Sequence, residues 1–436
     1  MQFYSTNGKA PMADLRKAVV KGLAEDKGLY MPQEIKTLPK AFFDNIQDMS
    51  FRDIAYNVAS AFFGEDVDGD ALYDIVADTL SFDCPVVKVN DNIYSLELFH
   101  GPTLAFKDVG ARFMARLLRY FLCSQNADKE QTVNVLVATS GDTGSAVANG
   151  FLGVDGIHVY VLYPKGKVSP IQECQFTTLG QNITAIEVDG VFDDCQALVK
   201  SAFMDEDLNK ALRLTSANSI NVARFLPQAF YYFNAYAQMK KKGLADNLVV
   251  CVPSGNFGNI CAGLFAKRMG LPIKRFIAAN NANSVFYEFL QTGEYLPRPS
   301  VQTIANAMDV GDPSNFARIF DLYGHSHAAI VKDISGTTFS DEQIAETIND
   351  VFSHTGYLCD PHGACGYRAL EEGLDADEVG VFLETAHPAK FKQTVDAIIE
   401  GDVEIPAPLA AFMQGKKESV PMSKDFADFK QFLLKA

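Results

Sequence analysis

The chain has no run of eighteen or more apolar residues, so no segment of it is predicted to cross a membrane as a helix. Its opening residues show neither an apolar core nor an arginine-rich, acid-poor character. We therefore expect no secretory or transit signal and a cytoplasmic location. Basic residues are also scarce. The chain has 38 lysines and arginines but 54 aspartates and glutamates, which gives a formal net charge of -16. No basic stripe offsets this charge, so nucleic acid is not expected as a partner.

The sequence also lacks the patterns of a metal or disulfide site. Eight cysteines are present, none spaced as C-x-x-C, and several lie in apolar segments, so we interpret them as reduced core residues. His325 and His327 have no acidic or cysteine partner set nearby, so no metal site is predicted. With 436 residues, 48% hydrophobic and 21% charged, and no internal repeat, the chain is typical of a globular protein of about two to three domains.

One lysine occupies an otherwise apolar stretch. Lys107 lies in LELFHGPTLAFKDVGARF, residues 96–113. A strand-like segment, Ile93 to Leu98, leads into a turn, and the pattern becomes helical from Ala105, so Lys107 is predicted to face inward near a helix start. Burial lowers the pKa of an amine and makes it nucleophilic toward aldehydes. An arbitrary lysine in such a run more often extends to water beside Phe106, so the interpretation depends on the rest of the chain.

A glycine-punctuated loop follows a predicted buried strand in NLVVCVPSGNFGNI, residues 247–260. Gly255 and Gly258 let the backbone approach a ligand, and the free amides of the following helix start suit a phosphate dianion. The same pattern also occurs in ordinary tight turns. It has neither the spaced glycines of a dinucleotide site nor the Gly-Lys-Ser/Thr ending of a nucleotide P-loop.

Two further strand ends carry polar loops. In VNVLVATSGDTGSAVANG, residues 133–150, hydroxyls and amides could hold a carboxylate, although a simple helix cap by Asp142 or Thr143 is the alternative. In VGVFLETAHPAKF, residues 379–391, Thr385 ends a strand and Lys390 lies one turn into a helix that begins at Pro388.

The loops together predict one pocket. In open parallel sheets, ligands bind beyond the carboxyl ends of the strands, so these loops are expected to converge. A lysine that reacts with aldehydes, combined with a phosphate-binding loop and no nucleotide motif, indicates pyridoxal phosphate as the cofactor.

Several sequence blocks carry a family resemblance. FHGPTLAFKD, ATSGDTGSA, LYPKGKVSP, TSANSIN, PSGNFGN, NAMDV and ETAHPAKF occur in this order. With the N-terminal segment, they resemble the threonine synthase family of fold-type II pyridoxal-phosphate enzymes. The resemblance implies a tryptophan synthase β-like α/β fold, in which two open parallel-sheet subdomains flank the active site, plus a mostly helical N-terminal segment. It also implies a β,γ-replacement that converts O-phospho-L-homoserine and water into L-threonine and phosphate.

The resemblance implies roles for individual residues. Lys107 would bind the cofactor covalently and move protons, and Thr385 would offer its hydroxyl to the pyridine nitrogen. Asp142, where many relatives carry asparagine, would lie near the cofactor's ring oxygen. The cofactor phosphate would be held by Gly255, Asn256, Phe257, Gly258 and Asn259, and the substrate carboxylate would be surrounded by Ser140, Gly141 and Thr143.

The substrate phosphate requires a second anion site. LTSANSINVARF, residues 214–225, offers Ser216, Asn218 and Arg224, and the planar guanidinium of Arg224 fits a phosphate in bidentate fashion. Without the family resemblance, Arg224 would more often be a solvated helix residue. Arg112 and Lys390 are further candidates, with a structural ion pair as the alternative for each.

The domain organisation is predicted in three parts. Residues 1–90 form a mostly helical domain, residues 91–400 a catalytic core of two subdomains, and residues 401–436 an extension of loop and terminal helix. Strands and helices alternate from Val133 to Ala211, which predicts a parallel sheet with right-handed crossovers. Residues 247–280 and 379–399 predict a second such unit.

Other functions stay open at this stage. A related phospho-lyase or a threonine/serine dehydratase would share these residues but release a keto acid and ammonia, and a binding protein could keep the cofactor without turnover. No long heptad pattern predicts an obligate assembly, so we expect a monomer or small homo-oligomer.

Overall fold

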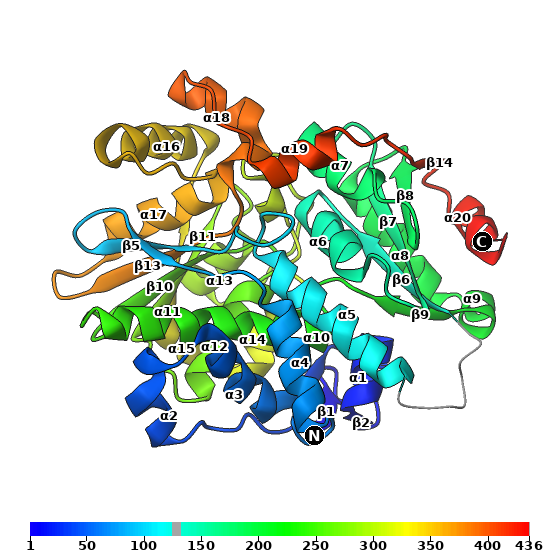
Figure 1. Ribbon diagram of the computed structural model, residues 1–436, viewed down its shortest axis with the longest axis horizontal. Coiled ribbons are helices and arrows are strands. Elements are labelled where there is room, and N and C mark those ends of the chain that lie inside the picture. The colour runs from blue at the N-terminus through cyan, green and yellow to red at the C-terminus, as the bar shows by residue number, and fades with distance from the viewer. Residues whose placement is uncertain (124–131, 436) are drawn as a thin grey trace.

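A computed structural model describes residues 1–123 and 132–435, and two largely parallel sheets lie side by side in it (Figure 1). The first sheet has the strand order β12-β11-β10-β13-β5-β4, with every neighbouring pair parallel except β4 and β5. Its strands are Ile334–Thr338 (β12), Arg275–Asn280 (β11), Leu248–Pro253 (β10), Val379–Glu384 (β13), Ile93–Glu97 (β5) and Val86–Lys88 (β4).

The second sheet has the order β14-β8-β7-β6-β9 and is parallel throughout. Its strands are Val420–Met422 (β14), Ile183–Val188 (β8), Ile157–Pro164 (β7), Val133–Ala138 (β6) and Arg213–Ser216 (β9). Strands β6 and β10 are buried at every position, as continuous apolar runs are when helices cover both faces of a sheet. The two predicted α/β units are therefore confirmed.

Helices surround both sheets. Those between Lys107 and Arg268 are Lys107–Cys123 (α5), Asp142–Phe151 (α6), Pro170–Thr177 (α7), Phe192–Met204 (α8), Glu206–Ala211 (α9), Val222–Phe225 (α10), Leu226–Gln228 (η2), Ala229–Lys241 (α11) and Gly258–Arg268 (α12). Those further along are Val285–Thr292 (α13), Asn306–Met308 (η3), Phe316–Leu322 (α14), His327–Asp333 (α15), Asp341–Thr355 (α16), Pro361–Gly373 (α17), Pro388–Phe391 (η4) and Lys392–Ile399 (α18).

Local sequence sets where several helices begin. Ser340 and Gln343 form a capping box at α16, and Asp360 caps α17 just before Pro361. These residue types satisfy the free amides of a first turn, and proline tolerates that position because it has no amide to satisfy.

The N-terminal part is helical with a small sheet added. Its helices are Leu15–Lys21 (α1), Lys40–Asn45 (α2), Ile46–Asp48 (η1), Phe51–Phe63 (α3) and Gly69–Thr79 (α4), and its strands are Gln2–Ser5 (β1), Ala13–Asp14 (β2) and Tyr30–Pro32 (β3). The antiparallel order β2-β1-β3 was not predicted, because strands of two to four residues are too short to show alternation.

The C-terminal segment differs from the predicted loop and helix. Besides Phe426–Lys435 (α20), it contains Ala407–Met413 (α19) and β14, which pairs in parallel with β8. Phe429 and Leu433 of α20 pack in one apolar cluster with Leu198 of α8. The tail is thus part of the second sheet's layer (Figure 1).

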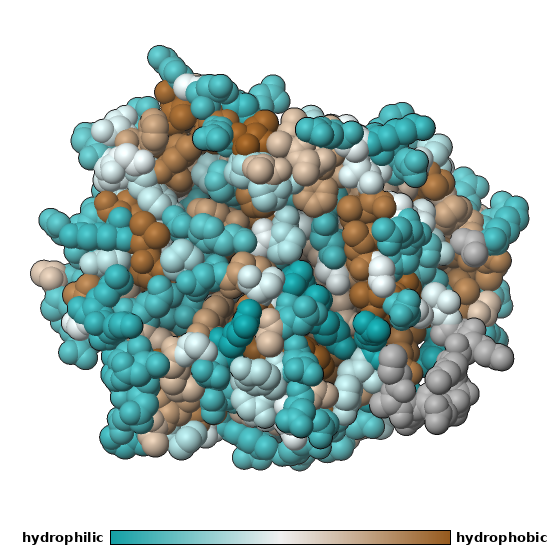
Figure 2. Space-filling view, viewed as in Figure 1, coloured by the Kyte–Doolittle hydropathy of each residue, from teal (hydrophilic) through white to brown (hydrophobic). Residues whose placement is uncertain are grey.

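The outer face is mixed in polarity. On the face that Figure 2 shows, most of the surface is hydrophilic, and hydrophobic residues gather in separate groups rather than in one continuous patch. Within the described ranges, no helix has the length and apolar character needed to cross a membrane.

Candidate active site

A pocket lies where strands of both sheets end. We call it the lysine pocket. It follows the carboxyl ends of β5, β10 and β13 in the first sheet and of β6 and β9 in the second, as parallel sheets predict. It is lined by Phe106, Lys107, Thr143, Asn218, Ser219, Arg224, Gln228, Pro253, Gly255, Asn256, Phe257, Gly258, Asn259, Ala307, Met308, His362 and Thr385.

Lys107 is the first residue of α5, and the backbone before it is fixed to the loop after β13. The amide of Phe106 donates to the carbonyl of Thr385 at 2.8 Å, and the hydroxyl of Tyr231 donates to the carbonyl of Phe106. No described group accepts a hydrogen bond from the Lys107 amine. Burial lowers the pKa of Lys107 to about 8; Asp142 opposes this shift, while Arg224 and Lys390 add to it. The structure therefore places Lys107 in the pocket with a lowered amine pKa, as predicted, and its role as a nucleophile stays a prediction.

The loop from Gly255 to Asn259 forms a narrow cradle before α12. A Cβ atom at Gly255 would lie 2.5 Å from the carbonyl oxygen of Ala307, and one at Gly258 would lie 3.2 Å from the Cβ of Ser219. Phe257 precedes α12 in the left-handed conformation, with φ of 63°. Within the described residues, the amides of Gly255, Phe257 and Gly258 find no acceptor. Such amides at a helix start bind phosphate.

The side chains of the two asparagines in this loop are held by neighbouring groups. Asn259 donates from its side chain to the carbonyl of Pro253 at 2.8 Å, and Asn256 accepts from the hydroxyl of Ser314 at 3.4 Å. Their side chains thus shape the cradle. Pyridoxal phosphate fits a pocket that combines the Lys107 amine, these free amides and Thr385 in its lining.

Asp142 and Lys390 form a buried ion pair beside the pocket. Lys390 is fully buried, and its amine lies 2.6 Å from Oδ1 of Asp142 and donates to the carbonyl of Thr103 at 2.8 Å. Gln172 also donates to Asp142, at 2.9 Å. Burial alone would raise the pKa of Asp142, but Lys390 and Lys107 lower it to about 2. For Lys390, the structure therefore shows the ion-pair alternative.

The helix start at Asp142 is not capped by Asp142 or Thr143. Gly141, with φ of 145°, is the residue before α6 and has no side chain to cap it. The hydroxyl of Thr139 accepts instead from the amides of Gly141 and Gly144, at 2.9 and 2.8 Å, so the alternative of a cap by Asp142 or Thr143 is wrong. A Cβ at Gly141 would lie 2.6 Å from the Gln172 side chain. The close approach explains glycine at this position.

Arg224 is buried rather than solvated. Its side chain is 2% exposed, Nη1 donates to the carbonyl of Ala217, and Nε has no partner among the described residues. Burial lowers the pKa of Arg224 to about 10. An unpaired donor that is buried beside a pocket is suited to an anionic ligand. Asn218 lines the same pocket, whereas Ser216 is not part of its lining. The hydroxyl of Ser216 accepts from the amide of Asn218 at 3.2 Å and lies 3.4 Å from its Oδ1.

Arg112 does not reach the lysine pocket. It points to the end of α4, where it donates to the carbonyl of Asp78 at 2.6 Å and to that of Thr79 at 3.2 Å. The structure therefore gives Arg112 a role in joining α5 to α4.

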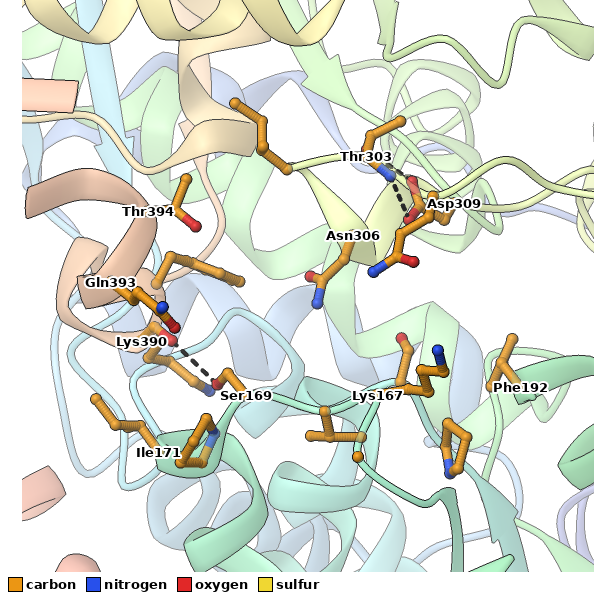
Figure 3. A pocket seen from close by; sticks show the side chains of 18 of the residues that line it. Lys167, Ser169, Ile171, Phe192, Thr303, Asn306, Asp309, Lys390, Gln393 and Thr394 are labelled. Carbon is orange, nitrogen blue, oxygen red and sulfur yellow. Dashed lines mark hydrogen bonds between the residues drawn. The ribbon is translucent and has the colours of Figure 1, made fainter. Parts of the chain in front are cut away.

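A larger cavity of about 970 Å³, which we call the cleft, adjoins these residues. In Figure 3, Lys390, Ser169 and Gln393 face Thr303, Asn306 and Asp309 across it, with Lys167 and Phe192 at the lower side. Ser140 also lines the cleft. The blocks LYPKGKVSP and NAMDV contain Lys167, Asn306 and Asp309. Membership in these blocks was the only indication in the sequence that these three residues lie near a site. Burial raises the pKa of Asp309 to about 6, although bonds from Thr303 and Asn281 oppose the shift.

Comparisons with known proteins agree with this geometry. Residues 81–384 match the model of the family described as pyridoxal-phosphate dependent enzyme, so the chain is a pyridoxal-phosphate enzyme of fold type II. Residues 2–80 and 363–433 match the models for the N terminus and the C-terminal part of threonine synthase. The chain therefore belongs to the threonine synthase family.

Full-length relatives support this assignment. The chain is 43% identical to threonine synthase from Serratia marcescens, with 100% of this chain and 99% of the relative covered. The crystal structure of threonine synthase from Escherichia coli matches with a TM-score of 0.93 at 41% identity, covering 100% of both chains. A PLP-bound threonine synthase from Brucella melitensis matches with a TM-score of 0.91 at 35% identity, covering 100% of this chain and 99% of that one.

Proposed function

We propose that the chain converts O-phospho-L-homoserine and water into L-threonine and phosphate. The observation that carries the proposal is Lys107, an amine with a pKa lowered to about 8 in a pocket that also contains a phosphate cradle. The full-length similarity to threonine synthases supports the same reaction.

Each site residue has a part in this proposal. When bound, pyridoxal phosphate supplies an electron sink for negative charge on the substrate carbons. Lys107 carries the cofactor and then moves protons among Cα, Cβ and Cγ of the substrate. Thr385 orients the pyridine ring with a neutral hydroxyl. The cradle of residues 255–259 holds the cofactor phosphate.

The substrate is held by a second group of residues. Ser140, Gly141 and Thr143 bind its carboxylate, while Asn218 and Arg224 receive its phosphate. The unpartnered Nε of Arg224 supports this role, and a local positive charge is needed because a chain with net charge -16 repels an anionic substrate at long range. Asp142 is already paired with Lys390, so we assign it to positioning of the ring and loop.

Three features stay predictions from the sequence. They are the division into residues 1–90, 91–400 and 401–436, a monomer or small homo-oligomer, and a cytoplasmic location.

The reaction can be tested by product analysis in deuterated water. Departure of phosphate from Cγ requires negative charge at Cβ, so protons leave Cα and Cβ before elimination, and solvent hydrogen then enters at Cγ. We expect threonine that carries deuterium at Cα and in the methyl group, one phosphate per threonine, and no ammonia. Proton NMR with phosphate and ammonia assays measures all of these.

Two other outcomes would contradict the proposal. Homoserine as the main product would indicate direct displacement of phosphate by water. A keto acid with ammonia would indicate the related phospho-lyase or dehydratase. The Lys107→Ala variant serves as the control, since phosphate release at the wild-type rate would show that this lysine is not the reacting group.

A further inference from the structure

A histidine without an assigned role lies in the wall of the lysine pocket. His362, on the first turn of α17, is 2% exposed and lines the pocket together with Lys107 and Thr385. Its Nε2 lies 3.1 Å from the amide nitrogen of Ala307, and its Nδ1 lies 2.6 Å from Oδ2 of Asp360. Both ring nitrogens therefore have partners.

These partners determine the tautomer of His362. A backbone amide can only donate, so Nε2 must be the unprotonated nitrogen that accepts. Nδ1 then carries the proton and donates it to Asp360. Asp360 is itself fixed, because its Oδ1 accepts from the amide of Gly363 at 2.6 Å as the cap of α17.

A second carboxyl group, that of Glu384, contacts the backbone of Asp360. Glu384 ends β13, is fully buried, and accepts from the amide of Asp360 at 2.5 Å. A Cβ at Gly363 would lie 1.7 Å from Oε2 of Glu384, so glycine is required there. Burial and the neighbouring Asp360 raise the pKa of Glu384 well above its ordinary value. This shift favours the protonated form of Glu384 beside Asp360.

Ala307 connects His362 to the phosphate cradle. Its amide is bound by His362, and its carbonyl oxygen lies 2.5 Å from where a Cβ of Gly255 would be. Because the two contacts are made by one residue of η3, a shift of Ala307 away from His362 moves the carbonyl that borders the cradle.

We propose that Asp360 and His362 are positioning residues for the cofactor-phosphate loop. Asp360 fixes the tautomer of His362, His362 holds Ala307, and Ala307 keeps the turn at Gly255 in its binding geometry. The proposal rests on pyridoxal phosphate binding but not on which substrate is used, so it can fail or hold independently of the proposed reaction.

Asp360→Asn tests the tautomer with the least change in shape. The new carboxamide oxygen can still cap α17, while its amide faces Nδ1 and forces the histidine proton onto Nε2, against the N–H of Ala307. A buried unsatisfied donor of this kind should weaken binding of pyridoxal phosphate about tenfold, within roughly 5- to 100-fold. Equilibrium dialysis measures the Kd, and ¹⁵N chemical shifts of labelled histidine report the tautomer.

A matched background separates this effect from damage to the helix start. His362→Gln keeps an acceptor near the Nε2 position and has no tautomer, so Asp360→Asn should change the Kd by less than about twofold in that background. In the otherwise unchanged chain, His362→Gln should bind the cofactor nearly as wild type does, and His362→Leu about tenfold more weakly.

Three results would overturn the proposal. One is an equal loss of affinity from Asp360→Asn in both backgrounds, which would assign the effect to the cap of α17. Another is an unchanged His362 tautomer in Asp360→Asn. The third is the same Kd for His362→Gln and His362→Leu.

Discussion

Replacing Lys107 by methionine should make the cofactor-free protein more stable while it abolishes activity. In the folded chain, the pKa of Lys107 is lowered from 10.5 to about 8, chiefly by burial. That difference corresponds to about 3 kcal/mol of unfavourable folding free energy while the amine is protonated. Part of the side chain faces the pocket, where water screens the charge, so we expect a gain of about 2–3 kcal/mol for Lys107→Met.

The pH dependence of the stability follows from the direction in which folding shifts the pKa of Lys107. The unfolded chain binds the proton more tightly than the folded one, so the cost is fully present below about pH 8 and disappears as the pH rises toward 10.5. The stability of the wild type should therefore rise across this interval relative to that of the variant. Below about pH 8, the difference in free energy of unfolding between the wild type and the variant should not change with pH.

Urea unfolding of both cofactor-free proteins between neutral pH and pH 10.5 measures the effect. Lys200→Met, at an exposed position of α8, is the matched control and should show no such change with pH. Equal stability of Lys107→Met and wild type at neutral pH, or a difference that persists unchanged at high pH, would refute the reasoning.

Three further variants test the site. Gly255→Val should weaken pyridoxal phosphate binding at least about tenfold, measured by equilibrium dialysis, because its Cβ would lie 2.5 Å from the Ala307 carbonyl. Arg224→Ala should keep the cofactor but raise the KM for phosphohomoserine about ten- to hundred-fold; lost cofactor with an unchanged KM would exchange the two anion sites. Lys390→Met should cost about 3–5 kcal/mol in urea unfolding, and adding Asp142→Asn should restore most of it. In the wild type, the contribution of Asp142 to the free energy of unfolding is fully present above its ordinary pKa of 3.8 and is lost as the pH falls through about 2. Urea unfolding at a series of pH values below 5 would measure this loss.

The fold and the cofactor site could be predicted because their signals are local in the sequence. Apolar runs such as residues 248–253 predict buried parallel strands, and polar loops follow them directly. Lys107 and the turn at Gly255 each lie within one such strand-loop-helix unit. Parallel topology then brings the strand ends together without further information.

The remaining features depend on contacts between distant segments. Lys390 donates to Thr103, 287 residues away, and nothing in either loop predicts that contact. Asp360 and His362 resemble an ordinary capped helix start until Ala307 is placed beside them. The position of Arg112 could have been inferred, because five residues along a helix rotate a side chain about 140° from Lys107. The strand Val420–Met422 is too short to show alternation.

The order of strands in the first sheet has a consequence for synthesis of the chain. β13, at residues 379–384, lies between β5, at residues 93–97, and β10 (Figure 1). A strand that is made late therefore separates β4 and β5, which are made early, from the other strands of the sheet. While the chain emerges from the ribosome, the edge of β5 that will meet β13 has no partner, and Lys107 has no pocket wall from Thr385. Such long-range pairing is slow and leaves strand edges exposed. Nascent chains stalled before residue 379 should therefore depend on chaperones and fail to bind the cofactor.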